Sequence, residues 1–204
     1  MFKWSLSLVL ILGLSAASWA QGVGGGEGIA QGRFELSAGG GGSLPFGDFS
    51  DAANTGYLFG ASGGYYVTPM YAVGVEFNYQ SYGASDEVVE VFQSLTGDSS
   101  ADFDWSVTQI SVFGKYLFTQ RNTAPYAKAH LGTYSLKGTG SALGASASSS
   151  DSNIGVGGGI GLQFKGQGNV GGFVEGVFHA IFTEGSSTTY ASGRAGVTFF
   201  LGGN

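Results

Sequence analysis

Residues 154–164 (IGVGGGIGLQF) decide the fold of this chain. Large apolar residues alternate with glycine or glutamine along most of this stretch, and a period of two is typical of a β-strand with two different faces. A helix is excluded because each glycine in a helix interior costs about 1 kcal/mol. Residues 71–80 (YAVGVEFNYQ) show the same alternation. Both stretches have the length of a membrane-crossing strand, about 9 to 11 residues, whereas strands in soluble domains usually have about five or six.

Six further segments have a similar pattern, so the chain is predicted to form eight strands. The additional segments are residues 33–44, 57–67, 105–118, 126–137, 170–182 and 190–201. Short turns follow the second, fourth and sixth strands, at residues 68–70, 119–124 and 165–169. Longer polar connections follow the first, third, fifth and seventh strands, at residues 45–56, 81–104, 138–153 and 183–189. This arrangement is typical of an outer-membrane barrel with its short turns in the periplasm. The predicted fold is all-β: an eight-stranded antiparallel up-and-down transmembrane β-barrel with both ends on the periplasmic side.

The composition argues against other classes of protein. Glycine accounts for 39 of 204 residues, but it has no three-residue period and there are only 3 prolines, which excludes a collagen-like chain. The aromatic content of 14% argues against disorder. No apolar run of about 18 residues follows the first part of the chain, so a helical membrane protein is disfavoured. The absence of cysteine removes disulfides, thiolate metal sites and cysteine nucleophiles.

The amino terminus is predicted to be a signal peptide, residues 1–20, cleaved after Ala20. Lys3 supplies the positive region, residues 6–14 (LSLVLILGL) the apolar region and residues 15–20 (SAASWA) the cleavage site. A membrane anchor is the rival interpretation, but the apolar stretch is too short to cross about 30 Å of hydrocarbon as a helix. The predicted regions that follow are a flexible Gly-rich leader, the barrel and a short tail: residues 21–31, 32–201 and 202–204.

The strand pattern also separates charged residues from lipid. When the more apolar face of each strand is placed against lipid, the charged and imidazole side chains fall on the other face, where a basic group avoids a cost of about 2 to 4 kcal/mol. The exception by parity is Lys137, which lies at the outer rim. Eight strands leave a lumen only wide enough for side chains, so unlike charges are expected to pair across it. The predicted polar network of the lumen comprises Arg33, Glu35, Glu76, Lys115, Lys128, His130, Glu175, His179 and Arg194.

Hairpin counting predicts neighbours within this network. Arg194 is expected near His179 and within diagonal reach of Glu175. Lys115 and Lys128 are expected side by side on adjacent strands, which requires a nearby carboxylate. Two glutamates are candidates to relieve this lysine pair: Glu35 and Glu76.

The long connections are acidic, so the outer rim is predicted to be anionic. Arg121 and Lys165 lie instead in the short turns. Residues 141–150 (SALGASASSS) have low complexity and are predicted to form a mobile outer loop. The acidic residues are Asp48, Asp51, Asp86, Glu87, Glu90, Asp98, Asp102, Asp104, Asp151 and Glu184. Aromatic residues near the two rims suit interfacial girdles, although they are also ordinary strand residues: Tyr57, Tyr65, Tyr71, Tyr79, Trp105, Tyr116, Phe118, Phe164, Phe182, Tyr190 and Phe199.

Several segments resemble the outer-membrane beta-barrel domain family, the small eight-stranded barrels related to the transmembrane part of outer membrane protein A. The resemblance covers residues 32–201 and implies an integral protein of the bacterial outer membrane. It implies outer-membrane lipid, lipopolysaccharide and the barrel assembly machinery as partners. The family usually ends on an aromatic residue, whereas four residues follow Phe200 here. The segments are GRFELSAGGG (32–41), PFGDF (45–49), GYYVTPMYAVGVEFNY (64–79), GKYLF (114–118), APYAKAHLG (124–132) and GRAGVTFF (193–200).

Catalytic and metal-binding patterns are weak in this sequence. His179 with Glu175 resembles a base and its orienting carboxylate, and Ser111 or Ser192 is the candidate nucleophile on an inward position. Two histidines on different strands without a third ligand indicate no defined metal site. We therefore expect no catalytic residue, no cofactor and no metal. The net charge disfavours nucleic acid as a partner, since 7 Lys and Arg face 14 Asp and Glu once Lys3 is removed.

Three functions remain open on the sequence alone. The first is a non-enzymatic envelope barrel with a structural or surface-interaction role through its acidic outer loops. The second is a narrow porin-like channel, in which the inward glycines of residues 154–164 leave a wet path. The third is a secreted soluble β-barrel that binds a small apolar ligand, which requires an apolar interior and a polar exterior.

Overall fold

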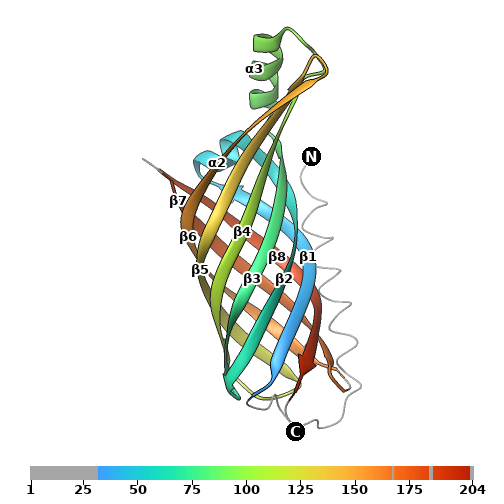
Figure 1. The fold of residues 1–204 in the computed structure, drawn as a ribbon, viewed down its shortest axis with the longest axis vertical. Helices are drawn as coiled ribbons and strands as arrows, with labels where there is room; N and C mark the ends of the chain where they lie inside the picture. The colour runs from blue at the N-terminus through green and yellow to red at the C-terminus, as the bar shows by residue number, and fades with distance from the viewer. Residues whose placement is uncertain (1–31, 167, 184–185, 203–204) are drawn as a thin grey trace.

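The protein is a closed barrel of eight antiparallel strands (Figure 1). The computed structural model describes residues 32–166, 168–183 and 186–202. Each strand pairs with the next along the chain, and the last closes on the first, which confirms the predicted fold. The strands are β1 (Phe34–Phe46), β2 (Ala53–Thr68), β3 (Tyr71–Ala84), β4 (Asp102–Leu117), β5 (Thr123–Ala142), β6 (Ala145–Lys165), β7 (Val170–Thr183) and β8 (Ser186–Leu201).

Parts of the predicted organisation lie outside the described residues. These are the signal peptide at residues 1–20, the leader at residues 21–31, residues 203–204 of the tail, and Glu184 among the acidic residues. These assignments stay predictions.

The two ends of the barrel differ. At the short-turn end, β2 joins β3, β4 joins β5 and β6 joins β7, and β1 begins there beside the end of β8 (Figure 1). At the long-loop end, α2 (Asp48–Ala52) lies between β1 and β2, and α3 (Asp86–Thr96) lies between β3 and β4. From β1 to β4 the connections alternate between long and short, as predicted.

For two of the four long connections the prediction is wrong. The sequence predicts polar loops at residues 138–153 and 183–189, but strand pairing continues to Ala142 opposite Ala145 and to Thr183 opposite Ser186. The predicted mobile loop at residues 141–150 is mostly the tip of the β5–β6 hairpin. Its Ser, Ala and Gly residues show no apolar alternation because no lipid contacts them, so the sequence pattern hides the strand. The hairpin nevertheless pairs its backbone N–H and C=O groups.

The helix α3 has its own start and stop signals, which the strand-based interpretation missed. The Ser85 hydroxyl caps the helix by accepting from the Val88 N–H at 3.5 Å, and Asp86 and Glu87 occupy the first turn. Gly97 ends the helix in the left-handed conformation, with φ 67. No helix in the described part of the chain is long and apolar enough to span a membrane.

The outward face of the barrel is apolar. Val75, Ile110, Val112 and Ile160 are among its most exposed side chains, and each points away from a lumen that holds the charged residues. This arrangement is the reverse of a soluble ligand-binding barrel, so that alternative is wrong. Most of the predicted rim aromatics also lie outward, with the correction that Tyr190 is fully buried inside the barrel and Trp105 packs beside it, because both have inward parity.

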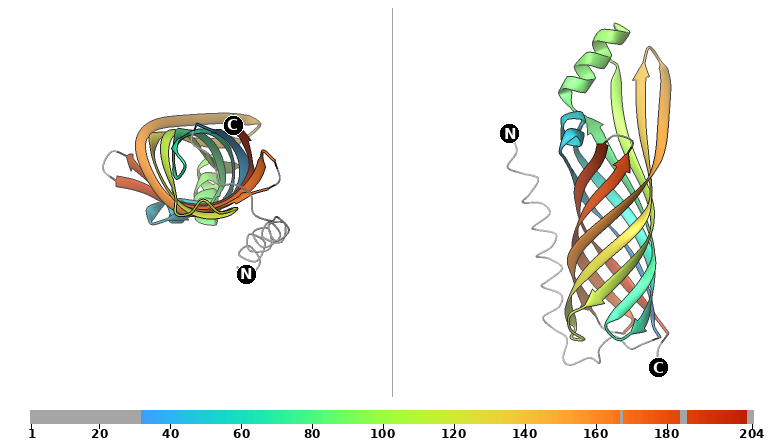
Figure 2. Two further views of the ribbon diagram at one scale, coloured as in Figure 1. Left: turned by 90° about the horizontal axis from the view of Figure 1, so that it is seen from below. Right: turned by 90° about the vertical axis from the view of Figure 1, so that its left-hand side faces the viewer.

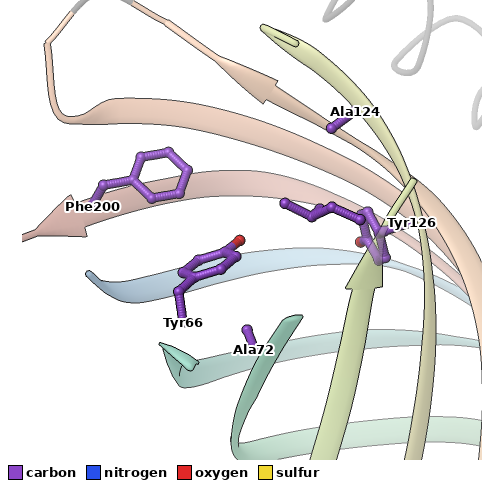
Figure 3. Close-up of a cluster of buried hydrophobic side chains, with 6 residues drawn as sticks. Tyr66, Ala72, Ala124, Tyr126 and Phe200 are labelled. Carbon is purple, nitrogen blue, oxygen red and sulfur yellow. The ribbon is translucent and has the colours of Figure 1, made fainter. Parts of the chain in front are cut away.

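Two clusters of apolar side chains close the lumen at its two ends. Near the short-turn end, Tyr66, Tyr126 and Phe200 project into the barrel (Figure 3). Near the long-loop end, a second cluster contains Tyr82, Tyr134, Val107, Ile181, Tyr190 and Ala53. Viewed end-on, the strands form a single closed ring (Figure 2). The polar network of the lumen therefore lies between two apolar plugs.

Candidate functional site: the polar lumen and the outer cap

Six buried charges form one network in the middle of the lumen. Lys128 Nζ lies 2.8 Å from carboxylate oxygens of both Glu76 and Glu175. Arg194 also contacts both glutamates, with its Nε 2.6 Å from Glu175 Oε1. The third cation, Lys115, is paired with Glu35. Three cations thus meet three carboxylates, as the charge cost of a buried site requires.

The observed pairings refine the neighbours expected from the sequence. Arg194 lies directly opposite Glu175 in the β7–β8 register, whereas His179 lies opposite Tyr190. Arg194 thus lies two inward positions along β8 from the partner of His179, so the expectation that it neighbours His179 is wrong, and it faces Glu175 directly rather than diagonally. Lys115 and Lys128 are opposite each other on β4 and β5, and both candidate glutamates act: Glu35 on the first lysine and Glu76 on the second.

Neutral side chains complete the hydrogen bonding of the carboxylates. The hydroxyls of Tyr66 and Tyr126 donate to Glu35 and Glu175, each at 2.7 Å. The Asn78 amide donates to Glu76 at 3.0 Å. Arg33 is separate from the six-charge network, since it donates to Asn169 at 2.7 Å and lies over the Phe200 ring at the short-turn end. Such a satisfied network makes the barrel interior rigid.

The two predicted lumen histidines form a second polar layer. His130 Nε2 and His179 Nδ1 both contact the Tyr134 hydroxyl, at 2.8 Å and 3.2 Å. His179 Nε2 contacts the Ser192 hydroxyl at 2.9 Å, and its ring stacks on Tyr190 with centroids 4.3 Å apart. All five side chains therefore belong to one contact group, which includes Tyr134 and Tyr190 of the apolar plug at the long-loop end.

This geometry does not assemble the catalytic arrangement considered from sequence. Glu175 contacts Lys128, Arg194 and Tyr126 rather than His179. Ser192 does meet His179, but the Tyr190 ring covers the imidazole face. Within residues 32–166, 168–183 and 186–202, no group of three His, Cys, Asp or Glu side chains is placed to hold a metal ion.

The inward glycines of β6 hold aromatic rings instead of leaving a wet path. A Cβ atom at Gly157 would lie 2.2 Å from His130 Nε2, and one at Gly161 would lie 2.4 Å from the Tyr126 ring. The cavity that remains among the charged side chains measures ≈ 20 Å³, which is room for about one water molecule. These contacts argue against the channel interpretation.

The second candidate site is a cap that stands beyond the other connections at the long-loop end. We define the cap as α3 together with the tip of the β5–β6 hairpin, residues 138–147, and Figure 2 shows the two standing side by side above the barrel. Phe92 of α3 packs edge-on against Phe103 with centroids 5.8 Å apart. The Gln93 amide donates to the Ala101 carbonyl at 3.1 Å. The helix is therefore docked on the strands below it.

Asp98 ties the helix to the hairpin. Its Oδ2 accepts from the Leu143 N–H at 2.7 Å, and its Oδ1 accepts from the hydroxyl and N–H of Ser100. Hydrogen bonds from the Ser100 hydroxyl, the Leu143 N–H and the Ser100 N–H lower the pKa of the Asp98 carboxyl. The ionised form of Asp98 is thus the one that holds the cap together.

The outer surface of the cap combines apolar and acidic side chains. Val91, Leu95 and Leu143 are 56%, 81% and 78% exposed. Val91 and Leu95 are four residues apart, so they share one face of α3. The acidic side chains exposed on α3 are Asp86, Glu87 and Glu90.

An apolar outer wall around a plugged, charge-paired interior defines a small transmembrane β-barrel. The sequence model of the outer membrane protein beta-barrel domain family matches residues 6–175. The chain belongs to this family and is an integral outer-membrane protein. The short-turn end accordingly faces the periplasm and the cap faces outward.

Solved structures with low sequence identity share the fold. Neisserial surface protein A is 20% identical, with a TM-score of 0.59 over 83% of this chain and 99% of that chain. The attachment invasion locus protein Ail of Yersinia pestis is 16% identical, with a TM-score of 0.58 over 84% of this chain and 99% of that chain. A major outer membrane protein of Thermus thermophilus is 10% identical, with a TM-score of 0.57 over 82% of this chain and 99% of that chain. Among curated proteins, no sequence matches this chain significantly.

Proposed function

We propose that the protein is a non-enzymatic surface-interaction barrel, whose cap binds a basic, partly apolar segment of a partner protein outside the cell. The barrel is the anchor, because its lumen is filled by paired charges between two apolar plugs. The cap is the binding element, because it is the part of the described chain that projects beyond the barrel with unpaired charge and exposed apolar area.

The observation that carries this proposal is the backbone of Leu143. Among the described residues it is the one residue other than glycine with a positive φ, 52. It forms the hairpin turn with Gly144, a two-residue turn in which asparagine and glycine are favoured at positive φ. The left-handed conformation costs an ordinary residue about 1 to 2 kcal/mol. A leucine that is both strained and exposed at the outermost turn is better explained by binding than by folding.

The charge of the cap selects the partner. Asp86, Glu87 and Glu90 are exposed in the first half of α3, and Glu87 lies one turn before Val91 on the face that Leu95 continues. No Lys or Arg occurs in α3 or in residues 138–147. A partner with lysine or arginine beside apolar side chains would therefore complement this surface, whereas a polyanion would be repelled.

A solved structure with a similar fold offers a comparison for the charge of the bound ligand. Ail is named as an attachment invasion locus protein, and it has been crystallised with the heparin analogue sucrose octasulfate. The acidic cap of the present protein favours ligands of the opposite charge. This contrast supports a surface role with a different class of partner.

The test measures peptide binding to the full barrel in zwitterionic lipid discs by surface plasmon resonance. The probes are an amphipathic Lys–Leu peptide and a Glu–Leu peptide of the same pattern, with empty discs as the reference. We expect the Lys–Leu peptide alone to bind, and Leu143→Asn or Leu95→Ser to weaken it about tenfold or more through loss of apolar burial.

Leu143→Asn also separates binding from folding. Asparagine tolerates a positive φ, so this variant is expected to keep or raise the unfolding temperature while it loses peptide affinity. Equal binding of the two peptides, or unchanged affinity in both variants, would contradict the proposal.

A further inference from the structure

Two hollows lie on the outward wall of the barrel, one towards the outer rim and one within the apolar belt. The rim hollow has a volume of ≈ 500 Å³, and its lining includes Tyr57, Tyr79, Ser81, Asp104, Ser106, Lys137 and Thr139. The belt hollow has a volume of ≈ 530 Å³ and is lined mainly by Leu36, Ala61, Gly63, Val75, Phe77 and Ile110. One is hydroxyl-rich and the other is apolar.

The two hollows follow one another along β2. Tyr57, Phe59, Ala61 and Gly63 alternate on the outward face, and the first lines the rim hollow while the last two line the belt hollow. Four residues of strand separate Tyr57 from Ala61, about 13 Å. The Phe59 and Tyr79 rings, 5.2 Å apart, lie between the hollows. An extended amphipathic molecule could therefore occupy both at once.

The rim hollow lies where the lipid-facing surface changes from apolar to polar. On β3 the outward residues change from Val75 and Phe77 to Ser81, and on β4 they change from Ile110 to Ser106. Aromatic residues such as Tyr57 and Tyr79 favour the membrane interface. The rim hollow is thus at the depth of lipid headgroups, and the belt hollow is at the depth of acyl chains.

Lys137 is the one cation that lines the rim hollow, where Asp104 is the one carboxylate. The other strand cations, Lys115, Lys128 and Arg194, are paired inside the lumen, and Arg33 is buried at the short-turn end. Lys137 is the one basic side chain in the described outer half that faces outward, and it is exposed opposite Ser106. Lys137 is the strand residue that the sequence pattern already identifies as the exception to the rule that charged side chains face the lumen.

We propose that this wall binds one molecule of an anionic outer-leaflet glycolipid, with a phosphorylated sugar headgroup in the rim hollow and an acyl chain in the belt hollow. Lys137 pairs with the phosphate, as basic residues at membrane surfaces do with anionic headgroups. The hydroxyls of Ser81, Ser106 and Thr139 face the sugar, and the small residues Ala61 and Gly63 leave room for the chain. The chemistry is that of a lipopolysaccharide anchor, bound at a defined wall instead of all around the barrel.

The charge half of this site is tested by titrating the detergent-solubilised barrel with lipid A, the acylated and phosphorylated glucosamine disaccharide, and measuring Kd. Lys137→Gln is expected to weaken binding about fivefold. Arg121→Gln is the matched control, because it removes an exposed cation from a short turn at the other end. Dephosphorylated lipid A is expected to bind the wild type and Lys137→Gln alike.

The apolar half is tested with a second pair of variants. Ala61→Phe fills the belt hollow and is expected to weaken lipid A binding, whereas Ala129→Phe adds the same ring to an exposed position on β5 outside that hollow. Heat-dependent mobility on electrophoresis confirms that each variant is folded. Equal affinity of Lys137→Gln and the wild type for lipid A, equal effects of the two phenylalanines, or no binding by the wild type would overturn the proposal.

Discussion

The lumen and the cap both carry several carboxylates, but those of the lumen are paired with cations and those of the cap are exposed. In the lumen, Glu76 and Glu175 are buried and shared between Lys128 and Arg194. In the cap, Glu87 and Glu90 are exposed, and their helix has no basic residue. A buried charge must be neutralised within the barrel because water cannot solvate it, whereas an exposed charge is free to meet a partner. Charge is structural in the first region and available for recognition in the second.

The largest effect is expected when the lumen network loses one carboxylate. Glu175→Gln leaves Lys128 and Arg194 with one shared glutamate in place of two, and an unpaired buried charge costs about 3 to 5 kcal/mol. The measurement is the free energy of unfolding in urea, with the barrel refolded in lipid vesicles.

The matched variant in the cap is Glu87→Gln. Because Glu87 is exposed, it is expected to change the unfolding free energy by less than about 0.5 kcal/mol. Adding Lys128→Met to Glu175→Gln restores charge balance and is expected to recover part of the loss. Similar effects of Glu175→Gln and Glu87→Gln would remove the distinction between the two regions.

A smaller loss of stability is expected from substitution of the inward glycines that contact side-chain rings in the lumen. Gly157→Ala would place a Cβ 2.2 Å from His130 Nε2 and 3.0 Å from the Phe178 carbonyl oxygen. We expect a destabilisation of about 1 to 3 kcal/mol from overpacking. The next residue is the control: a Cβ at Gly158 meets only the Lys128 carbonyl oxygen, 4.0 Å away. A Gly158→Ala variant as unstable as Gly157→Ala would show that β6 needs glycine for another reason.

The same contrast explains how far the sequence could be interpreted. Alternation and length were sufficient to predict all eight strands, because lipid on one side and charge on the other impose a period of two. The alternation also predicted that nine polar residues face the lumen, and all nine are buried there. Their burial does not by itself assign them a role. The parity rule fails where both faces contact water, which is why β5 and β6 run past residue 138 unnoticed.

Pairing across the lumen could not be deduced from one strand at a time. Glu35 on β1 pairs with Lys115 on β4, and this contact depends on the barrel's register and closure. The helix α3 had a local signal in Ser85 and the acidic residues after it, but residues 81–104 were interpreted only as a polar connection. Its docking depends on Phe92 meeting Phe103 across the loop.

The smallest effect is expected from Asp98, the hydrogen-bonded carboxylate that follows α3 and ties it to the hairpin tip. The pKa of Asp98 is lowered by the Ser100 hydroxyl, the Leu143 N–H and the Ser100 N–H, so its ionised form stabilises the docked cap. This contribution is present above the ordinary aspartate pKa of about 3.9 and is lost as the pH falls through the lower, folded-state value. Hydrogen exchange at the Leu143 amide, after correction for the intrinsic pH dependence, should therefore show protection that declines only in acid. Asp98→Asn should abolish the acid dependence, because an amide side chain does not ionise in this pH range. Glu90→Gln, on the helix that precedes Asp98, should leave it unchanged. Protection of Leu143 that is independent of pH in the wild type would show that the aromatic contact between Phe92 and Phe103 holds the cap without Asp98.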